Sequence, residues 1–168
     1  MLLALDVHYD EPADRAVAAA VAFDDWPAAT AAGRFVTRVE GVAPYVPGQF
    51  YRRELPCLLA LLAEHALRPA CLVVDGFVHL DADGTPGLGR HLFDALGGTT
   101  PVIGVAKTSF ARTDARFELR RGTSARPLYV TAAGMALDQA KAHVAAMHGE
   151  HRMPTLLTLV DHACRGRA

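Results

Sequence analysis

The segment Leu3-Ala4-Leu5-Asp6-Val7-His8-Tyr9 (residues 3–9) places one carboxylate inside an apolar run. Successive side chains of a β-strand point to opposite faces, so Leu3, Leu5 and Val7 share one face and Asp6 lies on the other. An apolar strand of this kind is typical of the centre of a sheet that is covered on both sides. A carboxylate buried there is costly unless it is paired or binds a metal. The segment therefore predicts a central strand whose Asp6 meets other charged groups.

Three further acids lie inside, or at the end of, apolar segments. Glu54 stands near the start of an expected helix, Asp75 ends a short apolar strand, and Asp161 lies on an expected C-terminal helix. Carboxylates from separate elements supply the oxygen ligands that magnesium prefers, and paired magnesium ions promote phosphodiester hydrolysis. We expect these acids to meet in such a site. The alternative for each acid, most of all for Asp161, is a surface cap or salt bridge.

Two further polar residues follow the same strands. Lys107 ends an apolar strand, as Asp75 does, so it is expected to steady a phosphate or the attacking water. The alternative is that its long side chain simply reaches solvent. His79 follows Asp75 by four residues and is either a polar loop residue or part of the substrate side of the site.

Hydrophobic periodicity and turn residues divide the rest of the chain into strands and helices in one α/β domain over residues 1–168. The first three strands are expected to form an antiparallel meander, because only short connections join them. We expect strands at 2–9, 16–23, 33–40, 71–74, 101–106, 115–120 and 127–131. We expect helices from about Glu54 to Leu67, and over 87–96, 134–147 and 154–164.

The composition excludes several classes of protein. Hydrophobic residues make up 51% of the 168 residues and charged residues 21%, which is typical of a globular protein and not of a disordered one. No apolar run reaches the roughly 18 residues of a membrane helix, and no secretion signal is evident, so we expect a cytoplasmic protein without a membrane partner. The net charge is only −1, but a basic stretch at 112–126 could contact phosphates.

Several segments, taken together and in this order, resemble the endonuclease V family. They are Asp6-Val7-His8-Tyr9, Pro44-Tyr45-Val46-Pro47-Gly48, Arg53-Glu54-Leu55-Pro56, Val74-Asp75-Gly76 and Ile103-Gly104-Val105-Ala106-Lys107. The resemblance implies a ribonuclease-H-like fold with a five-stranded mixed sheet flanked by helices. It also implies a Mg²⁺-dependent endonuclease, with Mn²⁺ as a substitute, and we expect the protein to be a monomer. Such an enzyme cuts the second phosphodiester 3′ to hypoxanthine (inosine) in DNA or RNA, in nucleic-acid repair or processing.

The resemblance also implies roles for individual residues. The metal carboxylates would be Asp6, Glu54 and Asp75, with Asp161, or else its neighbour His162, as a fourth ligand. Lys107 matches the active-site lysine of the family. The substrate side would comprise a strand-separating wedge at Tyr45, Val46 and Pro47, lesion-pocket backbone at Gly48 and Gly76, and His79.

Two segments depart from the family pattern and keep other functions open. Residues 76–80 read Gly-Phe-Val-His-Leu where the family has a longer Gly-Gln-Gly-x-x-His pattern, and residues 154–158 replace a Pro-Glu-Pro-Thr-Arg stretch. One alternative is a ribonuclease-H-like nuclease with another structured or single-stranded target. The other is a catalytically silent nucleic-acid-binding module.

Overall fold

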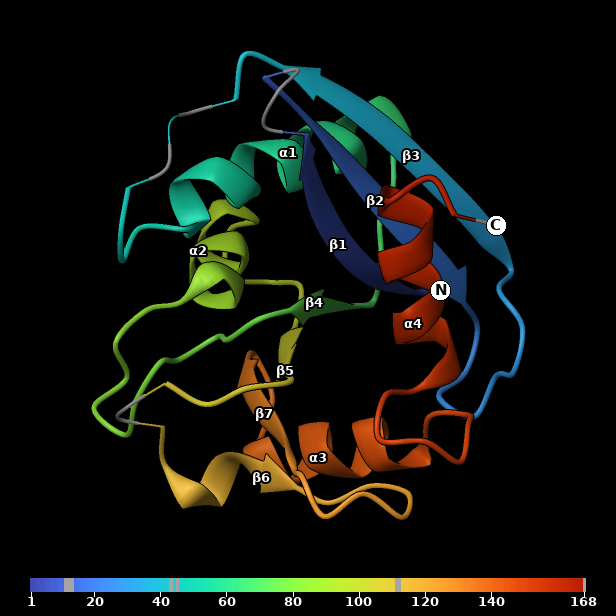
Figure 1. The fold of residues 1–168 in the computed structure, drawn as a ribbon, viewed down its shortest axis with the longest axis vertical. Helices are drawn as coiled ribbons and strands as arrows, with labels where there is room; N and C mark the ends of the chain where they lie inside the picture. The colour runs from blue at the N-terminus through green and yellow to red at the C-terminus, as the bar shows by residue number, and fades with distance from the viewer. Residues whose placement is uncertain (11–13, 43, 45, 111–112, 168) are drawn as a thin grey trace.

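The computed structural model describes residues 1–10, 14–42, 44, 46–110 and 113–167. In this part of the chain seven strands form one mixed sheet in the order β3-β2-β1-β4-β5-β7-β6 (Figure 1). The strands are β1 (Leu2–Asp10), β2 (Arg15–Phe23), β3 (Gly33–Glu40), β4 (Cys71–Asp75), β5 (Val102–Ala106), β6 (Glu118–Leu119) and β7 (Leu128–Ala133). The predicted antiparallel meander of the first three strands is confirmed.

The expected five-stranded sheet is wrong by two strands. The parallel centre β1-β4-β5 and the meander β3-β2-β1 account for five strands, and β7 and β6 extend the sheet beyond β5. β7 pairs antiparallel with β5, and the two-residue β6 pairs with β7. The expected strand at 115–120 is correspondingly short, because Ala115–Phe117 forms a 3-10 turn capped by the Asp114 side chain, which accepts from the Arg116 amide.

Helices cover both faces of the sheet and bury its two cores. They are α1 (Tyr51–Glu64), α2 (Leu88–Ala95), α3 (Leu137–Ala146) and α4 (Thr155–Cys164). α1 and α2 pack on the face that carries Leu3 and Leu5 of β1, whereas α3 and α4 pack on the face that carries Ala4. Both faces of β1 are therefore covered near its start, as its apolar sequence predicts. No helix in the described residues is long and apolar enough to cross a membrane.

The first helix begins earlier than its sequence suggests. It starts at Tyr51, so Pro56 lies inside the helix rather than in its first turn. Proline cannot donate to the carbonyl one turn back, which weakens a helix locally. Burial of Leu58, Leu61 and Leu62 against the sheet outweighs this loss. The earlier start places Glu54 in the first helical turn.

A close contact between β5 and the segment after β4 fixes the carboxyl end of β4. The backbone amide of Val78 donates to Thr131 Oγ1 at 2.8 Å, and the amide of Gly76 donates to the Val105 carbonyl at 3.0 Å. A Cβ atom at Gly104 would lie only 2.6 Å from the Gly76 carbonyl oxygen and 2.7 Å from Thr131 Oγ1. Gly104 therefore lets the chain after Asp75 lie directly against the sheet.

Replacement of Gly104 tests this packing. Gly104→Ala should lower the free energy of unfolding by about 1–3 kcal/mol, because backbone atoms must move to admit the methyl group. The matched control is Gly33→Ala, whose Cβ would meet side chains alone, the Phe35 ring at 3.3 Å and Ala22 Cβ at 3.8 Å. Urea unfolding of both variants measures the difference, and equal stability of the two would contradict the packing role.

Candidate active site

Four acids lie around the carboxyl ends of the parallel strands β1 and β4, where sites in open α/β sheets gather. Asp6 follows Leu5, which pairs with Val74, and Asp75 follows Val74 at the end of β4. The two carboxylates thus stand on neighbouring strands. Glu54 comes from α1 and Asp161 from α4, so each helical layer adds one acid.

Burial and mutual repulsion disfavour the ionised form of the acids. Burial raises the pKa of Asp6 to about 6, and the negative charge of Asp75 adds to the effect. Burial also raises the pKa of Glu54 to about 8, with further contributions from the charges of Asp6 and Asp75. The charges of Asp6 and Asp75 both act on Glu54, so the three carboxylates lie within electrostatic reach of one another.

Lys107 supplies a positive charge at this site. It follows β5, the strand next to β4, and its Nζ lies 3.5 Å from Asp75 Oδ2. Burial raises the pKa of Asp75, although the charge and the hydrogen bond of Lys107 oppose that rise. The predicted proximity of Lys107 to the acids is therefore confirmed, and the alternative of a lysine that only reaches solvent is wrong.

Asp161 lies at the margin of the acid cluster. Its Oδ1 accepts a hydrogen bond from Arg165 Nε at 3.0 Å. Although burial acts to raise it, the hydrogen bond and charge of Arg165 hold the pKa of Asp161 below its usual value. The charge of Asp161 acts on both Asp6 and Asp75, whereas His162 lines a different cavity with Arg34. Asp161 therefore lies closer to the acid cluster than His162 does, and its role as a fourth ligand stays a prediction.

The acid cluster fits a hard divalent cation in its chemistry. Carboxylate oxygens are the ligands that magnesium prefers, and a cation would relieve the repulsion that raises the pKa values of Asp6 and Glu54. Among the described residues, no three histidine, cysteine, aspartate or glutamate side chains are grouped closely enough to form a ready-made metal site. Carboxylate oxygens that could bind a metal are therefore present at the carboxyl ends of β1 and β4, but they are not arranged as a closed metal site.

Asp6 is held in place by two hydrogen bonds. Its Oδ1 accepts from the Val7 amide at 2.8 Å, and its Oδ2 accepts from Cys164 Sγ at 3.3 Å. Cys164 lies at the end of α4 and is buried. Nothing in the spacing of the cysteines in the sequence points to this contact, because it joins residues from opposite ends of the chain.

An apolar cavity of about 420 Å³ opens beside the acids, and Glu54 and Asp75 form part of its wall. Gly48 and Gly76, the expected lesion-pocket glycines, both line it. Two phenylalanines that the sequence did not single out also line it: Phe77 is buried and Phe110 is 57% exposed, with ring centroids 5.1 Å apart. A flat aromatic group entering from solvent would meet these two rings.

The expected wedge lies on the loop that leads into this cavity. Val46 and Pro47 are exposed and directly precede Gly48, whose φ of 75° favours glycine. Tyr45, the third expected wedge residue, lies outside the described residues. The exposure of Val46 and Pro47 leaves them accessible to a partner.

Two other expected contacts are placed elsewhere. His79 forms a β-bridge with Pro86 and lines a separate cavity with Asp81 and Arg116, so the structure does not bring it to the acids. In the basic stretch, Arg121 is buried and donates hydrogen bonds to the Met147 and His151 carbonyls. The interpretation of Arg121 as a phosphate contact is therefore wrong, because its guanidinium secures the chain before α4.

The strand order and the acids at the carboxyl ends of β1 and β4 define a ribonuclease-H-like protein. The chain belongs to the endonuclease V family, since the sequence model of endonuclease V matches residues 1–141. An endonuclease V of Streptomyces coelicolor is 31% identical over 187 residues, which cover 96% of this chain and 76% of the relative. One of Streptomyces avermitilis is 32% identical, with 96% and 77% covered.

Solved structures agree with the family assignment. The crystal structure of the Streptomyces avermitilis endonuclease V superimposes with a TM-score of 0.79 at 31% identity, covering 98% of this chain and 79% of that one. That of human ENDOV gives a TM-score of 0.77 at 26% identity, covering 98% and 82%. A Ciona intestinalis endonuclease V, crystallised with DNA containing an inosine followed by a ribo-adenosine, has the same fold, with a TM-score of 0.79 at 18% identity over 98% of this chain and 83% of that one.

The raised pKa values predict how the stability of the metal-free protein depends on pH. Between the usual pKa of Glu54, near 4.5, and its folded value of about 8, the folded state binds more protons than the unfolded state. The free energy of unfolding should therefore fall as pH rises through this window, by on the order of a few kcal/mol. Glu54→Gln should flatten this dependence in thermal unfolding with a chelator. An unchanged pH profile in that variant would contradict the burial of an ionisable Glu54.

Proposed function

We propose that the protein is a magnesium-dependent endonuclease that cleaves the second phosphodiester 3′ to hypoxanthine in DNA or RNA. The observation that carries this proposal is the shared wall between the acid cluster and the apolar cavity. Glu54 and Asp75 line the cavity and also interact electrostatically with Asp6. A base held in the cavity would therefore keep its strand beside the groups that perform hydrolysis.

Recognition of an altered base requires that the base leave the helical stack. The cavity suits an extruded base, because Phe77 and Phe110 offer aromatic faces and the glycines leave their backbone accessible. A Cβ at Gly48 or Gly76 would meet no atom within 4 Å, so the space beside both glycines is open. Val46 and Pro47 could occupy the gap that the base leaves in its strand. The inosine-containing DNA bound to the Ciona relative supports this choice of base.

Asp6, Glu54 and Asp75 would hold the magnesium, with Asp161 close enough to contribute its charge. When bound, magnesium supplies an activated water and neutralises charge on the phosphodiester. Glu54 must lose its proton before it can serve as a ligand, so metal affinity should rise with pH up to its pKa of about 8 and level off above it. Lys107, beside Asp75, would orient the phosphate and offset its negative charge.

A cleavage assay tests the function directly. Labelled single strands of DNA and RNA, with and without one central hypoxanthine, are incubated with the protein and Mg²⁺ or Mn²⁺. We expect a cut at the second phosphodiester 3′ to hypoxanthine and no cut in the unmodified strand. Equal cutting of both strands would favour a nuclease with another target, and binding without cutting in either metal would favour a silent binding module.

Asp75→Asn separates catalysis from folding. The amide keeps the shape of the carboxylate but removes its charge, so cleavage should fall by at least about 100-fold. Removal of one repelling charge should at the same time leave the melting temperature of the metal-free protein equal to or above that of the wild type. Cleavage rates and thermal unfolding of the same preparation measure both effects. Wild-type cleavage rates in this variant would remove Asp75 from the site.

Phe110→Ala tests the aromatic wall of the cavity. Because base–aromatic stacking contributes about 1–3 kcal/mol per base, the loss of this ring should weaken binding of a hypoxanthine-containing strand by roughly 10-fold. Phe110 is exposed, so the stability of the protein should change little. Fluorescence anisotropy with modified and unmodified strands provides the measurement. An equal loss of affinity for the two strands would show that Phe110 does not contact the altered base.

A further inference from the structure

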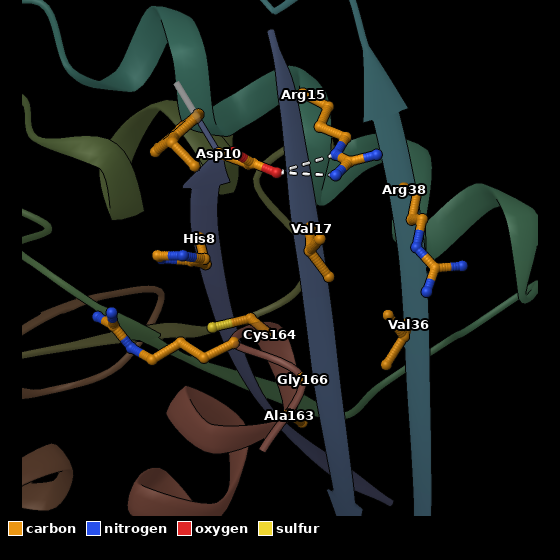
Figure 2. A pocket seen from close by; sticks show the side chains of 11 residues that line it. His8, Asp10, Arg15, Val17, Val36, Arg38, Ala163, Cys164 and Gly166 are labelled. Carbon is orange, nitrogen blue, oxygen red and sulfur yellow. Dashed lines mark hydrogen bonds and ion pairs between the residues drawn. The ribbon is translucent and has the colours of Figure 1, made fainter. Parts of the chain in front are cut away.

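A second and larger cavity lies beside the end of α4, whereas the apolar one lies beside the starts of α1 and α2. It is a groove of about 820 Å³ between the outer face of β1, β2 and β3 and the end of α4 (Figure 2). α4 packs on β1 and β2 but ends at Cys164, and no other helix among the described residues covers the sheet beyond it. His8, Val17 and Arg38 line the groove from the sheet, and Cys164, Arg165 and Gly166 line it from the helix end.

The groove is continuous with the acid cluster. His8 is two residues beyond Asp6 on the same face of β1, about 7 Å along the strand. Cys164, which donates to Asp6 Oδ2, forms part of the groove wall. His8 pairs with Val17, and Val17 pairs with Arg38, so the three side chains form a row about 10 Å long across two strand spacings. The row leads from the acids to the edge strand β3.

The charges in the groove leave Arg38 available to an anion. Arg15 is held by Asp10 at 2.8 Å, as the dashed lines in Figure 2 show, and Arg165 is held by Asp161 at 3.0 Å. Within the described part of the chain, exposed Arg38 makes no hydrogen bond or ion pair. Its guanidinium therefore presents uncompensated donors, a geometry that suits phosphate oxygens.

The geometry points to a binding path for the nucleic-acid backbone 3′ to the cut, along this groove, with Arg38 on one of its phosphates. This inference rests on the proposed function, since it takes the altered base to occupy the apolar cavity. The scissile phosphate then lies at the acids, two phosphodiesters further 3′. The nucleic-acid strand must continue away from the base cavity. The groove beyond Asp6 and His8 provides a path for it, and the exposed guanidinium of Arg38 lines this path.

Binding measurements on oligonucleotides of different length test the path. Labelled single strands with one hypoxanthine carry the same 5′ arm and end either one or eight nucleotides beyond the scissile phosphate. Anisotropy is measured with Ca²⁺ in place of Mg²⁺. We expect the longer 3′ arm to bind several-fold more tightly, and Arg38→Ala to remove most of that gain. Arg38→Ala should also reduce the slope of log affinity against log salt concentration by about 1.

Two kinds of variant serve as controls. Arg68→Ala removes an exposed arginine before β4, at the opposite end of the strand from Asp75, and should retain the gain from the 3′ arm. Val36 is 41% exposed on β3 and lines the groove, so its replacement should not affect folding. Val36→Lys should strengthen binding of the longer strand and Val36→Glu should weaken it.

The outcomes distinguish this inference from the proposed function. The path would be overturned by any of three results. These are equal affinity for both 3′ arms, an effect of Arg68→Ala as large as that of Arg38→Ala, and no binding of either strand. Because the readout is binding, it does not depend on cleavage. If the wild-type protein shows the 3′-arm and Arg38 effects but cuts no hypoxanthine strand in the cleavage assay, the path stands and the proposed activity fails.

Discussion

The gathering of several carboxylates, of which Asp6 and Glu54 are partly buried, around the carboxyl ends of the central strands β1 and β4 is the constraint on which the rest of the structure depends. Asp6 and Glu54 both have pKa values raised by burial and by neighbouring charge. Placing these acids together therefore lowers the free energy of unfolding when they are ionised. Both hydrophobic cores support this arrangement, because each holds one of the helices that carry Glu54 and Asp161 against the strands that carry Asp6 and Asp75. A structure optimised only for stability would have no reason to place these acids side by side.

The two sides of the acid cluster differ in chemistry. On the side of α1 and α2, the cavity is apolar and aromatic, and glycine backbone forms part of its wall. On the side of α4 and β3, the groove is open and carries arginines. A nucleic-acid strand has the same two kinds of surface, flat bases and a charged backbone. The site therefore separates the reading of a base from the holding of a backbone, with hydrolysis between them.

The sequence predicts the acids better than the cavities. Asp6, Glu54 and Asp75 interrupt apolar segments, and a buried charge that needs a partner is a local signal. Phe77 and Phe110 gave no such signal, because an aromatic residue in a loop has the same sequence appearance whether it packs in a core or lines a cavity. Thr131 and Gly104 act through contacts with residues distant in the chain, which periodicity cannot show. His79 is close to Asp75 in sequence but lines a separate cavity, so its role on the substrate side stays a prediction.

The contact between Cys164 and Asp6 joins residues 158 positions apart. During synthesis, β1 leaves the ribosome early, whereas α4 emerges only after every other element of the fold. Until then Asp6 lacks one of its two hydrogen-bond donors, and the wall that α4 contributes is missing. The order of translation thus delays assembly of the complete acid cluster until the rest of the domain is available. A nascent chain therefore lacks the complete acid cluster until α4 has been synthesised.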